Sequence, residues 1–123
     1  MNLGAGAVSR PGEDIQASRV VSAKVGVEES GGDADDNWLI LRNGDHVIGL
    51  FQGMFEKNML TFNPGWDQQC NNLDTFTDVR ELQRSIRDQG VEIGVEADES
   101  GEGPASFMIT DPDGNPILFD QHR

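Results

Sequence analysis

The sequence predicts an α+β domain in which two similar halves each contribute one helix and several strands. Each half contains one helix pattern, at residues 15–25 and 78–89. Each half also ends in two apolar runs joined by a glycine-containing turn, the pattern of a β-hairpin. The order of these elements repeats along the 123-residue chain, and such internal repetition indicates a fold built from two copies of one unit.

Length and composition favour a single folded domain without a membrane segment. A chain of 123 residues, 36% of them hydrophobic, has the size of one domain and can bury a core. No apolar run approaches the roughly 18 residues of a membrane helix, and no basic-then-apolar secretion signal begins the sequence. The single cysteine, Cys70, excludes an internal disulfide framework. We therefore expect a cytoplasmic protein without membrane contact.

The charge excludes one class of partner. Nine Lys and Arg residues against 22 Asp and Glu residues give a net charge of −13. Such a protein repels phosphate backbones, so we expect no nucleic-acid partner. A neutral or cationic small molecule is the more natural ligand. The alternative is that the acidic surface only keeps the protein in solution.

The first half begins with a weak strand signal and a helix. The small-residue stretch at 1–12 is compatible with an edge strand or with a frayed tail. Asp14 is placed to cap a helix at 15–25, which Gly26 ends. Residues 28–36 are acidic and contain glycines, but they lack the alternation and terminal glutamate of a calcium-binding EF-hand loop. We predict a solvated loop there.

A hairpin and a further strand follow. The apolar runs 38–41 and 47–51 are joined by Arg42-Asn43-Gly44-Asp45, and Asn-Gly between apolar runs is the strongest short-range hairpin signal. Residues 59–62 predict another strand, which Asn63-Pro64-Gly65 terminates.

The second half contains the clearest helix, at residues 78–89. Asp78 provides the N-cap and Glu81 occupies the third helical position, as in a capping box. Apolar residues recur on one face, and Gly90 closes the helix. The remaining elements that we expect are strands at 73–76, 91–95, 105–110 and 116–119, an acidic loop at 96–103 and a hairpin turn at 111–115.

Several strands are apolar on both faces, most clearly 38–41, 59–62 and 117–119. One helix per half covers only one face of a sheet. The other face must be covered by the opposite half, by a partner chain or by a bound ligand.

Three stretches carry a resemblance to a known family. Residues 14–27 match, in register, the first-helix pattern Asp-Ile-x-Ala-Ser-x-x-Phe-Tyr-x-x-Leu-Gly-Phe, with Val21-Ser22 in place of Phe-Tyr and Val25 in place of leucine. Residues 111–117 are similar to the turn that opens the last strand of that family, and 77–92 to its second helix. The sequence thus resembles the vicinal oxygen chelate superfamily, which includes glyoxalases, bleomycin-resistance proteins and extradiol dioxygenases.

The resemblance implies two βαβββ modules that form a cupped mixed sheet with helices on its outer face. It covers residues 14–121 and places the whole chain, 1–123, in one domain, with module one at about 1–55 and module two at about 58–121. In this family the fold is commonly completed by dimerisation, so a homodimer is expected.

Enzymes of this family hold a divalent metal through His and Glu side chains of the cupped strands. Leu118 stands where the last strand usually supplies glutamate, and the matching place in the first half is Ile48 or Gly49. None of these side chains binds a metal. Neither 5–11 nor 59–62 contains a histidine. The resemblance therefore predicts no metal, no other cofactor and no catalytic residue at the usual site.

Other side chains leave a metal-dependent alternative open. Asp120 lies two residues beyond Leu118, on the same face of its strand. His46 begins a strand and His122 is the penultimate residue. A metal centre normally needs three or more convergent ligands. Cys70 has no basic neighbour in sequence to activate its thiol.

The candidate ligand-binding residues are aromatic or soft side chains, with one carboxylate. Such groups bind flat or cationic molecules by stacking and cation–π attraction. Ordinary core packing is the alternative, which we favour for Trp38 and Phe107. The candidates are Trp66, Phe51, Trp38, Met54, Phe55, Phe107 and Asp120.

The leading hypothesis is therefore a metal-free protein, similar to the bleomycin-resistance branch, that binds a neutral or cationic small molecule in the sheet cup. The first alternative is a metal-dependent lyase, isomerase or dioxygenase that uses Asp120, His46 or groups of a second chain. The second alternative is a structural or regulatory dimer without small-molecule activity.

Overall fold

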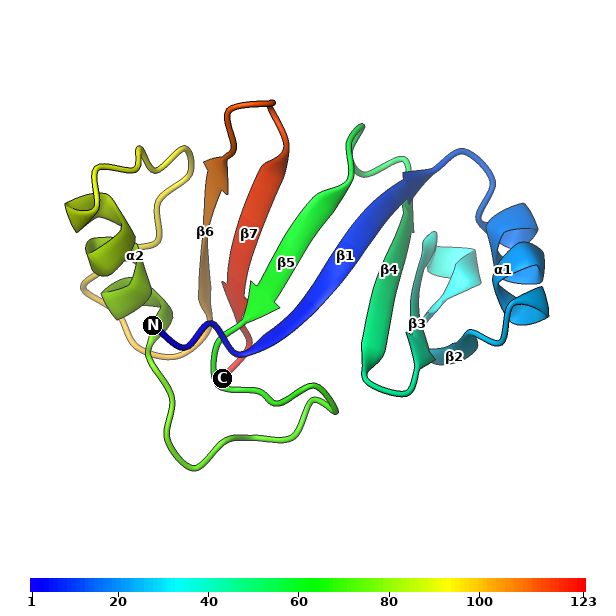
Figure 1. The fold of residues 1–123 in the computed structure, drawn as a ribbon, viewed down its shortest axis with the longest axis horizontal. Coiled ribbons are helices and arrows are strands. Elements are labelled where there is room, and N and C mark those ends of the chain that lie inside the picture. Colours follow the sequence, from blue (N-terminus) through cyan, green and yellow to red (C-terminus); the bar gives the residue numbers. More distant parts are fainter. The chain divides into compact units, whose positions relative to one another are not determined.

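The computed structural model describes residues 1–123 and confirms the α+β fold class (Figure 1). Two compact units are present: the α1 unit, Ala7–Met59, and the α2 unit, Met1–Gly6 with Leu60–Arg123. Neither helix is long and apolar enough to cross a membrane. The elements in chain order are β1 (Ala5–Gly12), α1 (Ile15–Lys24), β2 (Glu28–Asp33), η1 (Ala34–Asp36), β3 (Trp38–Asn43), β4 (His46–Gln52), β5 (Met59–Asn63), α2 (Val79–Asp88), β6 (Ala105–Thr110) and β7 (Pro116–Gln121).

In the α1 unit the strands lie in the order β2-β3-β4-β1, and only the β1–β4 pair is parallel. Leu39 pairs with Leu50 and Leu41 with Ile48, so these four side chains share one face. They pack with Ile15 of α1 into a small core. The strand interpretation of the N-terminal stretch is confirmed, since β1 pairs with β4 from Val8 onward.

Helix α1 starts as predicted but packs lightly. The Asp14 carboxylate accepts the amide hydrogens of Gln16 and Ala17, both at 3.1 Å. Only Ile15 of the helix is buried, while Val20 and Val21 are 55% and 62% exposed. The helix is therefore anchored chiefly at its first turn.

The prediction of a loop at 28–36 is wrong for most of its length. Glu28–Asp33 forms β2, which pairs antiparallel with β3 across a register shift between Glu29 and Gly31. Every residue of β2 is exposed. An edge strand with both faces in water has no apolar alternation to reveal it, and it forms because β3 supplies its hydrogen-bond partners.

The first hairpin is confirmed, with one refinement. Asn43 pairs with His46 and ends β3, so the two turn residues are Gly44 and Asp45. Gly44 takes the positive φ of 58°. Glycine at the first of two central positions is the arrangement of a type II′ turn.

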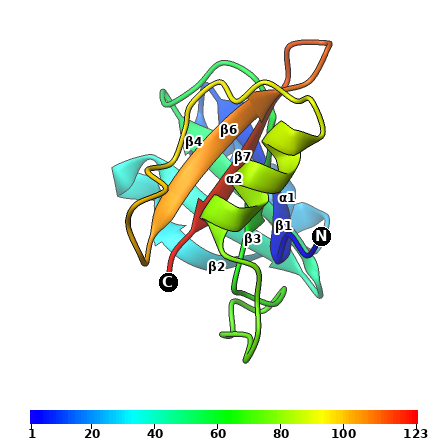
Figure 2. The ribbon, with the colours of Figure 1, turned by 90° about the vertical axis from the view of Figure 1, so that its left-hand side faces the viewer.

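In the α2 unit the strands lie in the order β5-β7-β6, with β5 parallel and β6 antiparallel to β7. Helix α2 lies across β6 and β7 (Figure 2). The core joins Val79, Leu82 and Ile86 of the helix to Phe107 and Phe119 of the strands. The rings of Phe107 and Phe119 stack at 4.5 Å.

The strands predicted at 91–95 and 73–76 are absent. Only Val95 makes an isolated bridge to Met108. Side chains of α2 hold the following segment instead: the buried Gln83 amide accepts from Ala97 N at 2.7 Å and donates to Ala97 O at 3.1 Å. Arg80 donates to Asp98 O at 3.0 Å and Gly103 O at 3.1 Å. Helix side chains thus satisfy backbone groups of the segment that follows residues 91–95.

Candidate functional site

Leu118, at the position where the resemblance implies a metal-binding glutamate, has one carboxylate, that of Asp120, on its face of β7. Leu118 on β7 pairs with Thr61 on β5 and with Met108 on β6. Asp120 shares the Leu118 face, which is the face opposite Phe107 and Phe119. One carboxylate is therefore the only ionisable group on this part of β7.

In the α1 unit the strand register decides between the two candidate positions. Ile48 lies on the α1 side and packs against that core. Gly49 consequently lies on the opposite face, with Phe51. A Cβ at Gly49 would lie 2.7 Å from Cε2 of Phe51 and 3.4 Å from the Ser9 hydroxyl oxygen. The Phe51 ring thus occupies the space that a metal-binding side chain at Gly49 would need.

The side-chain chemistry does not fit the family's metal centre. Across residues 1–123, no three His, Cys, Asp or Glu side chains converge in an arrangement that could hold a metal ion. A protein site for a catalytic divalent metal supplies about three such ligands. With Leu118 and Gly49 at the usual positions, these residues assign no step to a metal.

Two predicted residues, Trp66 and Asp120, meet at His122. The Asp120 carboxylate lies 3.1 Å from His122 Nε2. The rings of His122 and Trp66 stack with centroids 4.8 Å apart and an angle of 4°. Trp66 Nε1 donates to the Asn72 side chain at 3.1 Å. One face of the indole and its polar edge are therefore already in contact with protein groups.

The loop that carries Trp66 is tied to the end of β7. The Arg123 guanidinium donates to Gly65 O at 2.9 Å and to Leu73 O at 2.7 Å. It also lies 4.6 Å from the centre of the Phe76 ring. These contacts hold the ends of the irregular segment together and position the indole next to His122.

The remaining accessible candidates gather in the α1 unit. Trp38 pairs with Phe51 across β3 and β4, so both side chains lie on one face. The Phe51 and Phe55 rings lie 5.3 Å apart at 48°. Met54 is 54% exposed in the same segment. Phe107, by contrast, is fully buried in the α2 unit core, so the core-packing interpretation is confirmed for it. The same interpretation is wrong for Trp38, which is 36% exposed.

A cavity beside Phe55 adds two residues that sequence reasoning missed. Its volume is about 670 Å³, and Glu13 and Glu56 line it together with the Phe55 ring. The remaining lining residues are Pro11, Gly12, Gln52 and Gly53. We call this the Phe55 cavity.

The sequence offers no local signal for this grouping. In the sequence, Glu13 directly precedes the helix N-cap residue Asp14, whereas Glu56 lies far along the chain. They meet because β1 and β4 are parallel, with Gly12 opposite Gln52, so that both strands end at the same edge. No lysine or arginine lines the cavity, so its field is negative.

The comparisons agree with this architecture. A family model for the glyoxalase/bleomycin resistance protein/dioxygenase superfamily matches residues 41–119. A solved superfamily member from Vibrio splendidus 12B01 is 15% identical, with a TM-score of 0.64, over 94% of this chain and 97% of that chain. No curated protein matches the sequence.

Two larger solved proteins contain the same fold. The Mn(II)-bound glyoxalase from Novosphingobium aromaticivorans is 19% identical, with a TM-score of 0.58, over 94% of this chain and 37% of that chain. Homoprotocatechuate 2,3-dioxygenase from Brevibacterium fuscum is 19% identical, with a TM-score of 0.61, over 98% of this chain and 32% of that chain. These likenesses concern the fold. With the family model, they show that the chain belongs to the glyoxalase/bleomycin resistance protein/dioxygenase superfamily.

Proposed function

We propose that this protein binds a small organic cation without a metal, and that the Phe55 cavity is the binding site. The observation that carries the proposal is the combination of one aromatic ring with two carboxylates in a cavity without a basic side chain. Neither Glu13 nor Glu56 takes part in a hydrogen bond or ion pair, so both are available to a ligand. The proposal also covers a neutral aromatic ligand, which we expect to bind in this cavity more weakly than a cation.

The physical chemistry supports a cation of modest size. A volume of about 670 Å³ falls within the usual range of small-molecule sites, roughly 300–1,000 Å³. A cation over an aromatic face gains about 0.5–2 kcal/mol, more as water is excluded. The net charge of −13 adds a long-range attraction that salt screens.

The proposed binding site includes residues outside the Phe55 cavity. We propose that Phe51, Trp38 and Met54 contact the part of the ligand that extends beyond the Phe55 cavity. Trp66 and Asp120 of the α2 unit are proposed as a separate contact area. Phe107 is left out of the proposed site because it is fully buried.

Calorimetric titration with benzyltrimethylammonium tests the proposal, with benzyl alcohol as the uncharged comparison. The cation is expected to bind more tightly than the alcohol, and more weakly as salt increases. Glu13→Gln and Glu56→Gln should each weaken cation binding by about tenfold, equivalent to about 1.4 kcal/mol. Phe55→Leu should weaken the binding of both probes, because it removes the aromatic ring.

Glu92→Gln provides the matched control, because Glu92 is exposed and lines none of the cavities described. This variant removes the same charge from the protein as a whole. The proposal fails if it weakens cation binding as much as the variants at Glu13 and Glu56 do, or if the wild-type protein binds neither probe.

We also propose that the protein is a homodimer, the state that the family resemblance implies. The exposed valines of α1 support this by offering apolar surface to a second chain. Light scattering should give twice the chain mass of 13.4 kDa. A mass of one chain at micromolar concentration would contradict the proposal.

A further inference from the structure

A smaller cavity lies in the α1 unit, between helix α1 and the parallel strands β1 and β4. Its volume is about 310 Å³. The strands contribute Arg10, Pro11 and Leu50, and the helix contributes two hydroxyl groups, those of Ser18 and Ser22. We call this space the Arg10 cavity. Pro11 is the one lining residue that it shares with the Phe55 cavity.

Strand register places the Arg10 side chain on the α1 side of the sheet. Arg10 pairs with Leu50 in the parallel β1–β4 pair, and paired residues of neighbouring strands point to the same face. Leu50 packs with Ile15 of α1 in the core of this unit. The Arg10 side chain therefore leaves the sheet toward the helix, whereas Gly49 and Phe51 lie on the opposite face.

The two serines lie on the side of α1 that faces the strands. Ile15, Ser18 and Ser22 recur at helical spacing and are the least exposed residues of the helix. Neither serine hydroxyl makes a hydrogen bond within the protein. Ser22 stands where the first-helix pattern of the family has tyrosine. The smaller side chain leaves space between this part of the helix and the strands.

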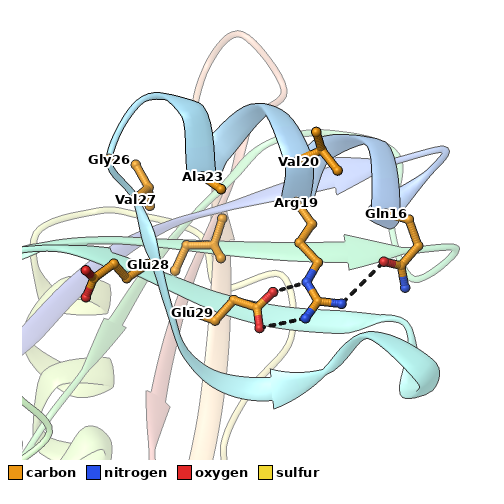
Figure 3. A pocket seen from close by; sticks show the side chains of 9 residues that line it. Gln16, Arg19, Val20, Ala23, Gly26, Val27, Glu28 and Glu29 are labelled. Atoms are coloured by element: carbon orange, nitrogen blue, oxygen red, sulfur yellow. Dashed lines mark hydrogen bonds and ion pairs between the residues drawn. The ribbon is translucent and has the colours of Figure 1, made fainter.

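Arg10 is the one charged residue that lines this cavity, and it makes no hydrogen bond or ion pair. Arg19, on the side of α1 that faces β2, is by contrast already neutralised. Its guanidinium contacts both carboxylate oxygens of Glu29, one of these contacts measuring 3.1 Å (Figure 3). The Arg10 cavity is therefore positive, although the whole protein is acidic.

These groups favour an anion with a carboxylate. The guanidinium group presents N–H donors in pairs that match the two oxygens of a carboxylate, and serine hydroxyls donate as well. The net charge of −13 opposes an anion mainly at long range, because physiological salt screens charges beyond about 8 Å. Glu13 and Glu56 line the Phe55 cavity and not this one.

We propose that the Arg10 cavity binds a small monocarboxylate with a short hydrocarbon chain. The carboxylate lies at the Arg10 guanidinium and accepts hydrogen bonds from the hydroxyls of Ser18 and Ser22. The hydrocarbon covers the apolar lining residues Leu50 and Ala17. A volume of about 310 Å³ is at the lower end of the usual range of roughly 300–1,000 Å³, which suits a short acid. This site takes a ligand of opposite charge from the proposed Phe55 site and does not depend on it.

Titration with isovalerate, followed by amide chemical shifts and by calorimetry, tests this inference, with isovaleramide as the uncharged comparison. We expect the largest shift changes at residues 10–11, 17–22 and 50. Arg10→Gln should weaken isovalerate binding by about tenfold and leave the weaker binding of isovaleramide unchanged. Ser22→Tyr fills the cavity and should reduce the binding of both probes. An amide spectrum like that of the wild type checks that this variant is folded.

Arg84→Gln is the matched control, because Arg84 is an exposed residue of α2 that lines none of the cavities described. It removes the same charge and should leave isovalerate binding unchanged. Equal weakening by Arg84→Gln and Arg10→Gln would overturn the inference, as would full binding by folded Ser22→Tyr or equal affinity for the acid and the amide. Glu13→Gln distinguishes the two sites, since it should weaken benzyltrimethylammonium binding and retain isovalerate binding. Loss of isovalerate binding in Glu13→Gln would contradict a separate Arg10 site.

Discussion

The imidazole of His122 lies flat against the indole of Trp66, with ring centroids 4.8 Å apart and an angle of 4°. The Nε2 atom, at the edge of the same imidazole, lies 3.1 Å from the Asp120 carboxylate. His122 thus connects the end of β7 to a loop residue far away in the sequence. The contact covers one face of the tryptophan that sequence reasoning selected as a ligand contact.

Removing this imidazole should expose the indole. In a Trp38→Phe background, where Trp66 is the only tryptophan, His122→Ala should increase quenching of Trp66 fluorescence by acrylamide. His46→Ala is the control, because His46 is exposed and far from Trp66 in the sequence. Equal quenching before and after the His122 change would show that the stacked arrangement does not persist in solution.

A side chain at Gly49 should disturb Phe51. A Cβ there would lie 2.7 Å from the phenyl ring, so Gly49→Ala forces the ring to move. We expect a loss of about 1–3 kcal/mol in the free energy of unfolding, as for other overpacked sites. Chemical denaturation measures this loss.

A double-mutant cycle identifies the cause. In a Phe51→Leu background the loss caused by Gly49→Ala should shrink, because the clashing ring atoms are gone. A loss that is the same in both backgrounds would mean that Phe51 does not fill the space above Gly49.

Asp78 should make the stability of the α2 unit depend on pH. Burial alone would raise the pKa of Asp78, but hydrogen bonds from Arg80 and Gln121 outweigh it and hold the pKa below its ordinary value of 3.8. A carboxylate whose pKa is lower in the folded state stabilises that state above its unfolded pKa. This contribution is lost as the pH falls from about 3.8 through the lower pKa of the folded state.

Two substitutions at Asp78 distinguish its role as the helix N-cap from the effect of its negative charge. Asp78→Ala removes the N-cap acceptor and should cost about 0.5–2 kcal/mol at pH 7, whereas Asp78→Asn keeps a capping oxygen and should cost less. The difference between wild type and Asp78→Asn should disappear in strong acid. Denaturation curves between pH 7 and pH 2 measure it. A difference that stays constant across this range would contradict the role given to the charge.

The donor chemistry predicts weak metal retention. After incubation with nickel, zinc, manganese or iron and desalting, elemental mass spectrometry should find far less than one metal per chain, because no three ligating side chains converge. A value near one would overturn the metal-free proposal. Asp120→Asn and His46→Ala would then show whether the alternative ligands hold the metal.

Local patterns were sufficient for the elements whose signals lie within a few residues. Asp14 and Asp78 cap their helices as predicted, because an N-cap bond joins residues two or three positions apart. The Gly44 turn is equally local. The resemblance to the superfamily also implied, from the sequence, that Leu118 stands where the last strand usually supplies a metal-binding glutamate.

Tertiary structure decided the features that depend on distant partners. Strand β2 exists because β3 pairs with it. Residues 91–95 form no strand, and the backbone after them is held by the side chains of Gln83 and Arg80. Strand register also determined that Gly49, rather than Ile48, faces away from α1. A one-residue change in register would reverse that choice.

The Phe55 cavity is another feature that depends on residues distant in the sequence. The sequence by itself determined the family, the helices, the hairpins and the side chains that are unable to bind a metal. Only the parallel pairing of β1 with β4 brought Glu13 and Glu56 to one cavity. Hydrogen bonds between strands distant in sequence depend on which backbone groups meet in the folded chain, and no pattern within one segment records that.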